Sequence, residues 1–284
     1  MKANLHISMM ATAAVALLAV SCVKDTLYHT PHPNKGALTI TLQNITASDN
    51  YVMDVDGQSS DITGSPFTFP DLLEAGAHRL VIHNRPEGFS FDGVMAYVNT
   101  LGNKSRADGT SIIPLPGYLF TFSQEITITA DDTLRVSLVP QQRVRDLQLE
   151  LEVTQGRPEL IQSVTATLSG IAGTFDMEKG QTSGEPASTV LSFTREGNML
   201  LADTRLLGTM ESTQTLVLDI VFADGGRTQR IEVDMTEALK EFNNDMSTTY
   251  CVTGTLETPV GLEESTATIT GWEAIDGGNV SAEL

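Results

Sequence analysis

One cysteine near the start of the chain, Cys22, stands where covalent chemistry is expected. It follows a basic start at Lys2 and a mostly apolar run from Met9 to Val20, with small Ser21 directly before the thiol. This order is typical of a secretory signal. The run is shorter than the ~20 residues that a helix needs to span a bilayer. A cysteine directly after such a run is typical of a bacterial lipobox, in which the thiol is acylated and becomes the new N-terminus.

The lipobox pattern is met with one departure. Such a motif usually has leucine three residues before the cysteine, whereas here Ala19 holds that place and Leu18 stands one step earlier. Ordinary cleavage near Cys22, leaving a free thiol, is the alternative. We expect lipidation, because the basic start, the apolar run, the small residue and the cysteine agree. Residues 1–21 are then a lipoprotein signal peptide, residues 22–35 a lipidated tether, and the rest a body held at a membrane.

The remaining polar clusters predict turns more readily than chemistry. Asp54 and Asp56 with Gly57 partly match a calcium loop, but the later ligands and the bidentate glutamate are missing, so we expect a turn. The pair Asp131-Asp132 precedes a predicted strand, as turn residues do. His78 and His83 are five residues apart, so on a strand they face opposite ways and share no metal.

No sequence motif for catalysis was found. The chain has no phosphate-binding G-x-x-x-x-G-K-[ST] motif, no G-x-S-x-G nucleophile elbow and no H-E-x-x-H metal motif. We therefore expect no catalytic residues, no cofactor and no metal site. A hydrolase would require acids or histidines to converge from distant strands, and this is the least favoured reading.

Cys251 and the aromatic residues leave two questions open. With Cys22 acylated, Cys251 has no disulfide partner, and its alternating surroundings predict a buried structural thiol. Trp272 is the single tryptophan and could form a sugar-stacking platform if Tyr97, Tyr118 and Tyr250 gather around it. A glycan-binding outer-membrane lipoprotein is therefore the alternative function.

Length and charge narrow the class of protein. The chain has 284 residues and a formal net charge of -19. At about 100–200 residues per domain, this length predicts two domains. The negative charge makes nucleic acid and anionic lipid poor partners, because both repel an acidic surface. A strongly negative surface is consistent with a soluble domain that is exported from the cytoplasm.

Alternation of apolar and polar residues predicts strands along most of the chain. Leu38, Ile40 and Leu42 alternate with threonines, and residues 147–153 alternate more cleanly still. We place a domain boundary at residues 140–142, giving β-sandwiches over 36–140 and 141–284, with Arg143 and Arg145 exposed in the linker. One short helix is predicted from Asp234, where Glu237 has capping-box spacing.

Several tracts resemble one family. The sequence is similar to the Bacteroidetes-type fimbrillin-associated lipoproteins, which are anchor or accessory subunits of type V fimbriae. The similarity covers nearly all of the mature chain and is carried by residues 22–36, 167–173, 205–208, 239–243 and 267–272.

The resemblance implies a fold, a partner and a location. The implied fold is all-β, with two tandem transthyretin-like β-sandwiches. The implied function is that of a non-enzymatic fimbrial anchor or accessory subunit, tethered to the outer membrane through lipid on Cys22. Its implied partners are fimbrillin-like subunits, bound by strand addition at an unpaired sheet edge.

Overall fold

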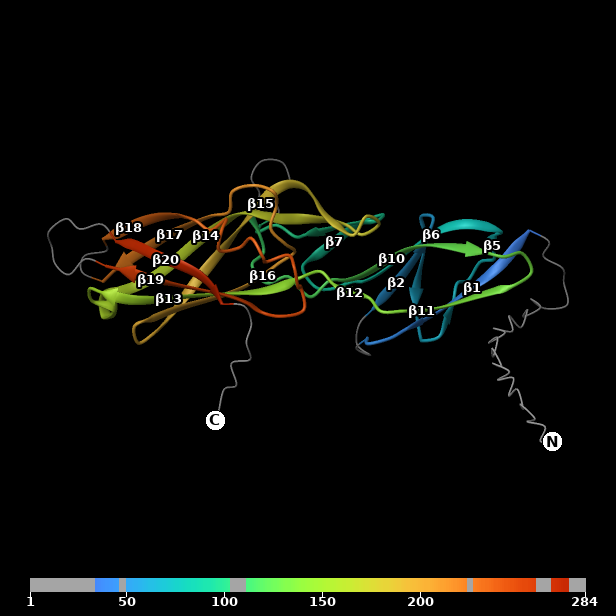
Figure 1. The fold of residues 1–284 in the computed structure, drawn as a ribbon, viewed down its shortest axis with the longest axis horizontal. Coiled ribbons are helices and arrows are strands. Elements are labelled where there is room, and N and C mark those ends of the chain that lie inside the picture. Colours follow the sequence, from blue (N-terminus) through green and yellow to red (C-terminus); the bar gives the residue numbers. More distant parts are fainter. Residues whose placement is uncertain (1–33, 46–49, 103–110, 224–226, 259–266, 276–284) are drawn as a thin grey trace, which may run out of the picture.

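The computed structural model describes residues 34–45, 50–102, 111–223, 227–258 and 267–275. In this part of the chain nearly all regular structure is β-strand, as predicted, apart from one 3₁₀ turn at Pro158–Leu160. The strands form two lobes arranged along the long axis of the molecule (Figure 1). We call β1–β6 with β10–β12 the N-lobe, and β7–β9 with β13–β20 the C-lobe. The described residues include no helix that is long and apolar enough to cross a membrane.

The N-lobe has two facing sheets. The first has the order β11 (Thr133–Leu138), β1 (Lys35–Leu42), β4 (Phe67–Thr68), and β5 (Leu73–Glu74) also pairs with β1. The second has the order β12 (Gln141–Gln142), β10 (Phe120–Ile128), β6 (Gly76–Asn84), β2 (Tyr51–Val55), β3 (Gln58–Ile62). Alternate apolar residues such as Leu38, Ile40 and Ile82 are fully buried in one core, each contributing about 1.5–3 kcal/mol.

The C-lobe is built on one long path of paired strands. Its order is β18 (Thr228–Asp234), β17 (Thr215–Phe222), β14 (Ile161–Asp176), β15 (Gln181–Glu196), β16 (Met199–Leu206), β13 (Arg145–Gln155), β19 (Tyr250–Glu257), β20 (Thr268–Ile275). In β13 the predicted alternation is confirmed, because Leu147, Leu149 and Leu151 are fully buried. Their common face packs into the C-lobe core.

Three strands from the first half of the chain belong to the C-lobe. β7 (Phe89–Asp92) pairs with β8 (Met95–Val98), β8 pairs with β14, and β9 (Ser111–Ile112) runs parallel to β15. Ala96, Val98 and Ile112 are buried in the C-lobe core. The chain thus leaves the N-lobe after β6, contributes to the C-lobe and returns as β10. The predicted domain boundary between residues 140 and 141 stays a prediction. These pairings place β7, β8 and β9, which precede that boundary, with the C-lobe.

The helix predicted from Asp234 is not formed. The amide of Leu239 donates to the carbonyl of Met235, but those of Phe242 and Asn244 donate only three residues back. Asp234 Oδ1 accepts from the Thr236 amide at 2.8 Å and so makes a local turn instead of a capping box. Residues 235–244 are therefore a series of turns. The apolar positions were correctly assigned, since Leu239 and Phe242 are fully buried.

The expectation of exposed arginines at the boundary was wrong. Arg145 is 2% exposed. Its guanidinium donates to the carbonyl oxygens of Thr248 and Phe242, both at 2.6 Å, and lies over the Tyr250 ring at 4.7 Å. Irregular turns leave carbonyl groups without strand partners, and a five-donor guanidinium can satisfy several of them. Arg145 therefore fastens the turn segment to the start of β13.

Arg143 is also partly buried. Its Nε donates to Thr121 Oγ1 at 2.8 Å, and its guanidinium lies 5.2 Å from the centre of the Phe175 ring. Burial lowers the pKa of Arg143. Since Thr121 belongs to β10 and Phe175 to β14, this side chain joins the two lobes.

Replacing Arg145 by alanine tests the fastening role. Loss of the charged donors leaves buried carbonyl groups unsatisfied, so we expect the free energy of unfolding to fall by about 3 kcal/mol. Urea unfolding followed by circular dichroism measures the change. Arg157→Ala is the control, because Arg157 is 57% exposed in its ion pair with Glu159 and its loss should cost less than about 1 kcal/mol. Equal losses for both variants would contradict the role.

Candidate functional site

The predicted lipidation residue, Cys22, lies outside the described residues. The described chain enters the N-lobe at the end that points away from the C-lobe, where β1 and β5 lie (Figure 1). There the first residues of β1 pair with β5, and Lys35 Nζ lies 3.4 Å from Glu74 Oε1. A tether preceding residue 34 would thus join the molecule at one pole of its long axis.

Strand β1 is fixed inside its sheet. It pairs in parallel with β11 over six residues and antiparallel with β4 and β5. Gly36 permits the close approach to the β10–β11 turn, since a Cβ atom there would lie 2.3 Å from the carbonyl oxygen of Thr129. A partner strand would therefore meet the edge strands of the N-lobe. In the described structure the longer edge strands are β11 and β3, and the short ones are β4, β5 and β12.

The edge of β3 is defined by its hairpin. Asp56 and Gly57 have φ values of 53° and 85°, as a two-residue type I′ turn requires, and Val55 lies opposite Gln58. Opposed residues alternate between bonded and non-bonded pairs. Because Val55 and Gln58 flank the turn as a hydrogen-bonded pair, the main-chain groups of Gln58, Ser60 and Ile62 hydrogen-bond to β2. Those of Ser59 and Asp61 point outward, away from β2. Strand β3 was not predicted, because its mostly polar residues show no alternation of apolar and polar positions.

A pocket of about 770 Å³ opens where β3 ends. Its floor is apolar, with Leu42 and Tyr51 buried and Ile62 partly buried. Its rim is polar; it includes Asp61 and Arg85, whose ion pair has an O–N distance of 2.9 Å. The full lining is Leu42, Ile45, Asn50, Tyr51, Asp61, Ile62, Thr63, Gly64, Ser65 and Arg85. No sequence motif indicated this pocket.

A side chain replaces a strand partner beside this pocket. β4 pairs with β1 only at Thr39 and Ile40. Two residues further along β1, the Leu42 amide donates to Ser65 Oγ at 3.0 Å, and Ser65 Oγ lies 3.4 Å from the Leu42 carbonyl oxygen. The sandwich is therefore open between the ends of β1 and β3.

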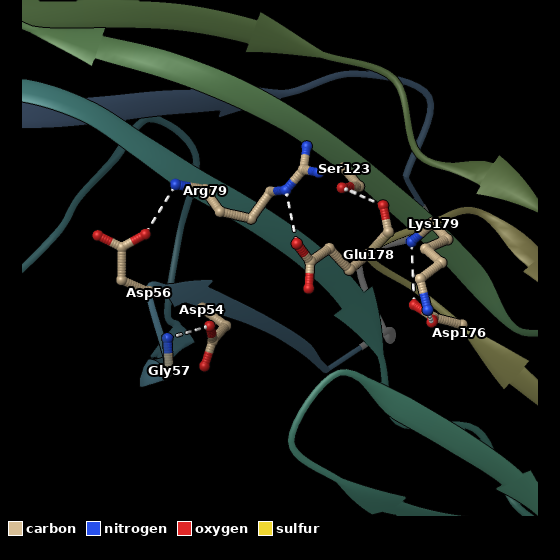
Figure 2. Close-up of polar contacts among 8 residues, drawn as sticks. All are labelled: Asp54, Asp56, Gly57, Arg79, Ser123, Asp176, Glu178 and Lys179. Carbon is tan, nitrogen blue, oxygen red and sulfur yellow. Dashed lines mark hydrogen bonds and ion pairs between the residues drawn. The ribbon is translucent and has the colours of Figure 1, made fainter.

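Asp54 and Asp56 shape the β2–β3 hairpin, as predicted. Asp54 accepts from the Gly57 amide at 2.8 Å, and Asp56 accepts from the Arg79 amide at 2.8 Å (Figure 2). Asp54 also accepts from Ser59 Oγ at 2.7 Å. The described residues hold no group of three or more His, Cys, Asp or Glu side chains placed to bind a metal. Asp132 likewise makes a turn contact, accepting from the Thr133 amide.

The two strand histidines have separate roles. Both ring nitrogens of His78 contact acceptors, Nδ1 at 2.7 Å from Asp56 Oδ2 and Nε2 at 2.7 Å from the Glu74 carbonyl oxygen. Burial opposes its charge, but these contacts outweigh it and raise the pKa of His78. His83 is buried, stacks on Phe91 with ring centres 4.5 Å apart, and has its pKa lowered by burial.

A polar contact joins the lobes beside the hairpin (Figure 2). Arg79 Nε of β6 donates to Glu178 Oε1 at 3.1 Å, and Ser123 Oγ of β10 donates to the Glu178 carbonyl oxygen at 2.9 Å. Glu178 lies in the turn between β14 and β15, which Asp176 closes by accepting from the Lys179 amide. This contact holds the C-lobe turn against two N-lobe strands.

The aromatic residues do not form a platform. Trp272 is half-buried, with its ring 3.0 Å from where a Cβ atom on Gly254 would lie. Tyr250 is buried against Phe242, and Tyr118 lies beneath Arg205 and donates to Asp146 Oδ2. Tyr97 lies on β8. The structure therefore does not bring Trp272 and these three tyrosines together.

The buried position predicted for Cys251 was wrong. It is half-buried, because in β19 the inward positions belong to Tyr250 and Val252. Burial, together with Glu150 and Asp203, raises the pKa of its thiol. A raised pKa disfavours the thiolate, which is the nucleophilic form.

Known proteins share this fold. A family model for the fimbrillin-A associated anchor proteins Mfa1 and Mfa2 matches residues 96–276. The fimbrial anchor protein Mfa2 from Porphyromonas gingivalis is similar at 9% identity, covering 84% of this chain and 97% of that chain, with a TM-score of 0.57. No curated protein matches the sequence.

Two structures described as candidate adhesins from Bacteroides ovatus are equally similar, each with a TM-score of 0.57. One has 15% identity and covers 84% of this chain and 92% of that chain. The other has 9% identity and covers 90% of this chain and 99% of that chain. At these identities the likeness shows the fold alone.

The His78 contacts predict a pH-dependent stability. Because the folded pKa is raised above the unfolded value of about 6.5, the stabilisation is full below that value and is lost as pH rises through the folded pKa. His78→Gln should therefore cost more stability at pH 6 than at pH 9, as measured by urea unfolding. Asp56→Asn, which keeps an acceptor for the Arg79 amide, should reduce the pH dependence. A cost for His78→Gln that is independent of pH would contradict this prediction.

Proposed function

Because the chain belongs to the family of fimbrillin-A associated anchor proteins, we propose that it is a non-enzymatic anchor or accessory subunit of a fimbria. The family match across residues 96–276 carries this proposal. The fold likeness to the Porphyromonas gingivalis fimbrial anchor supports it. In that role the protein connects a membrane to a protein fibre.

The membrane connection is proposed to be lipid on Cys22. A signal peptide over residues 1–21 is removed, the thiol is acylated, and residues 22–35 tether the body to the outer membrane at the cell surface. Entry of the chain at the pole of the N-lobe supports this arrangement, because a tether there leaves both sides and the far pole accessible.

The connection to the fibre is proposed to be strand addition by a fimbrillin-like subunit. Sheet edges offer main-chain donors and acceptors to another extended chain. The N-lobe sheets end at the longer strands β11 and β3 and at the short strands β4, β5 and β12, and these edges support an acceptor role for this lobe. On the same family grounds we propose that the two lobes are tandem transthyretin-like sandwiches, divided near residues 140–141 except that β7, β8 and β9 join the second sandwich.

The non-enzymatic character is proposed from what the polar residues do. Asp54 and Asp56 shape a hairpin, His78 bonds to Asp56 and Glu74, and Glu178 joins the lobes. The glycan-binding alternative gains no support from Trp272, whose ring packs on Gly254.

Cys22→Ala tests the tether, with Cys251→Ala as the matched control. We expect Cys22→Ala to fold but to leave the membrane fraction, since lipid on this thiol is the proposed attachment. Cys251→Ala should stay in the membrane fraction, because its thiol has no anchoring role. Fractionation and immunoblotting of native cells measure both. Retention of the processed Cys22→Ala variant in the membrane would overturn the tether.

Co-purification tests the fimbrial role. After gentle detergent extraction, the wild-type chain should retain fimbrillin-like subunits, and its deletion should alter the fimbriae or release them from the cell. Recovery without such subunits, together with unchanged fimbriae in the deletion strain, would contradict the proposed function.

A further inference from the structure

The edge of β3 and the pocket at its end form one continuous surface. Ser59 and Asp61 direct main-chain groups outward, and Ile62, the last residue of β3, lies in the pocket lining. Residue pairs across neighbouring strands point to the same face of a sheet. The residue of an added strand opposite Ile62 would therefore point inward, toward the opening between the two sheets.

The β11 edge is less suited to a partner. Its terminal amide at Thr133 is capped by Asp132 Oδ1 at 2.7 Å, and Pro140, which has no N–H group, follows shortly after the strand. Charged side chains and proline are devices by which proteins blunt sheet edges. Both edges carry an exposed charged residue, Arg135 on β11 and Asp61 on β3, but the Asp61 charge is paired with Arg85 and a proline follows within two residues only after β11.

We propose that the β3 edge is the acceptor for the partner strand, and that the strand inserts a large apolar side chain into the pocket between β1 and β3. This assignment rests on the proposed function. Main-chain bonds to Ser59 and Asp61 fix the register, while Leu42, Tyr51 and Ile62 bind the apolar side chain.

The pocket defines the chemistry of the partner segment. An extended segment is required by the straight edge, and a large apolar residue at the position opposite Ile62 is required by the apolar floor. Polar neighbours on the segment would meet the rim, where Asp61 and Arg85 already neutralise each other. The occupant is thus a strand of a fimbrillin-like subunit with one apolar anchor residue.

The main-chain contact is tested by Asp61→Pro in the mature full-length chain. Proline removes the outward N–H and is tolerated on edge strands, so the β2–β3 hairpin keeps its bonds. Asp61→Ala removes the same carboxylate but keeps the N–H. Ser137→Pro makes the equivalent change on β11. The main-chain bonds from Ala37 to Asp132 and from Gln43 to Leu138 show that every second residue of β11 bonds to β1, and Ser137 lies between two of these, so its N–H points outward.

The probe is the fimbrial subunit that co-purifies with the wild-type chain, isolated and titrated by calorimetry. Asp61→Pro should raise the Kd about tenfold or more, while Asp61→Ala and Ser137→Pro stay close to wild type. A tenfold loss for Ser137→Pro with none for Asp61→Pro would overturn the assignment in favour of β11. Wild-type affinity for both proline variants would overturn acceptance at either edge.

Gly64→Trp tests the pocket independently of the hairpin. Gly64 lines the pocket, and a Cβ atom there meets nothing within 4 Å, so a large side chain can enter the open space without displacing the backbone. Gly64→Trp should weaken subunit binding about tenfold, whereas Gly64→Ala should not. Unchanged binding by Gly64→Trp would overturn the role of the pocket.

These outcomes separate the two proposals. If the wild-type chain binds the subunit and the Asp61 and Gly64 variants bind equally well, the β3 assignment fails and the anchor function stands. If no fimbrial subunit co-purifies with the wild-type chain and the deletion strain keeps its fimbriae, the anchor function fails first. Urea unfolding of each variant confirms that a loss of binding is not a loss of folding.

Discussion

Main-chain hydrogen bonding at sheet edges is the constraint on which the N-lobe and its proposed role depend. Strand β1 lies between β11 and the short strands β4 and β5, and Gly36 lets it approach the β10–β11 turn. Strand β1 therefore already has strand partners on both sides. Any partner strand must use an edge, and the outward groups of Ser59 and Asp61 offer one.

The same pairing rules join the lobes. Strands β7–β9 leave the first half of the chain and pair with β14 and β15, so part of the C-lobe sheet comes from residues that precede β10. The side chains of Arg79 and Glu178 are each 42% exposed in their ion pair. Such an exposed pair contributes little to stability on its own. Partly buried Arg143, which contacts both Thr121 and Phe175, adds a better shielded link.

The sequence predicted the all-β class because alternation follows directly from burying one face of a strand. Leu147, Leu149 and Leu151 show this most clearly. Alternation says nothing about pairing, so it could not reveal that β7, β8 and β9 join the C-lobe. It also missed β3, whose polar residues lie at an edge. The Asp234 helix failed because Asp234 bonds to Thr236 in a turn, and Arg145 was misplaced because its carbonyl partners lie about a hundred residues away.

Amide hydrogen exchange of the mature chain, alone and bound to its fimbrial subunit and resolved at β3 and β11, tests strand addition at the β3 edge. We expect slower exchange at Ser59 and Asp61 in the complex, because an added strand would accept from these outward amides. Exchange at Ser137 should be unchanged. A stable complex in which the amides of Ser59 and Asp61 exchange as fast as in the free chain would contradict strand addition at β3.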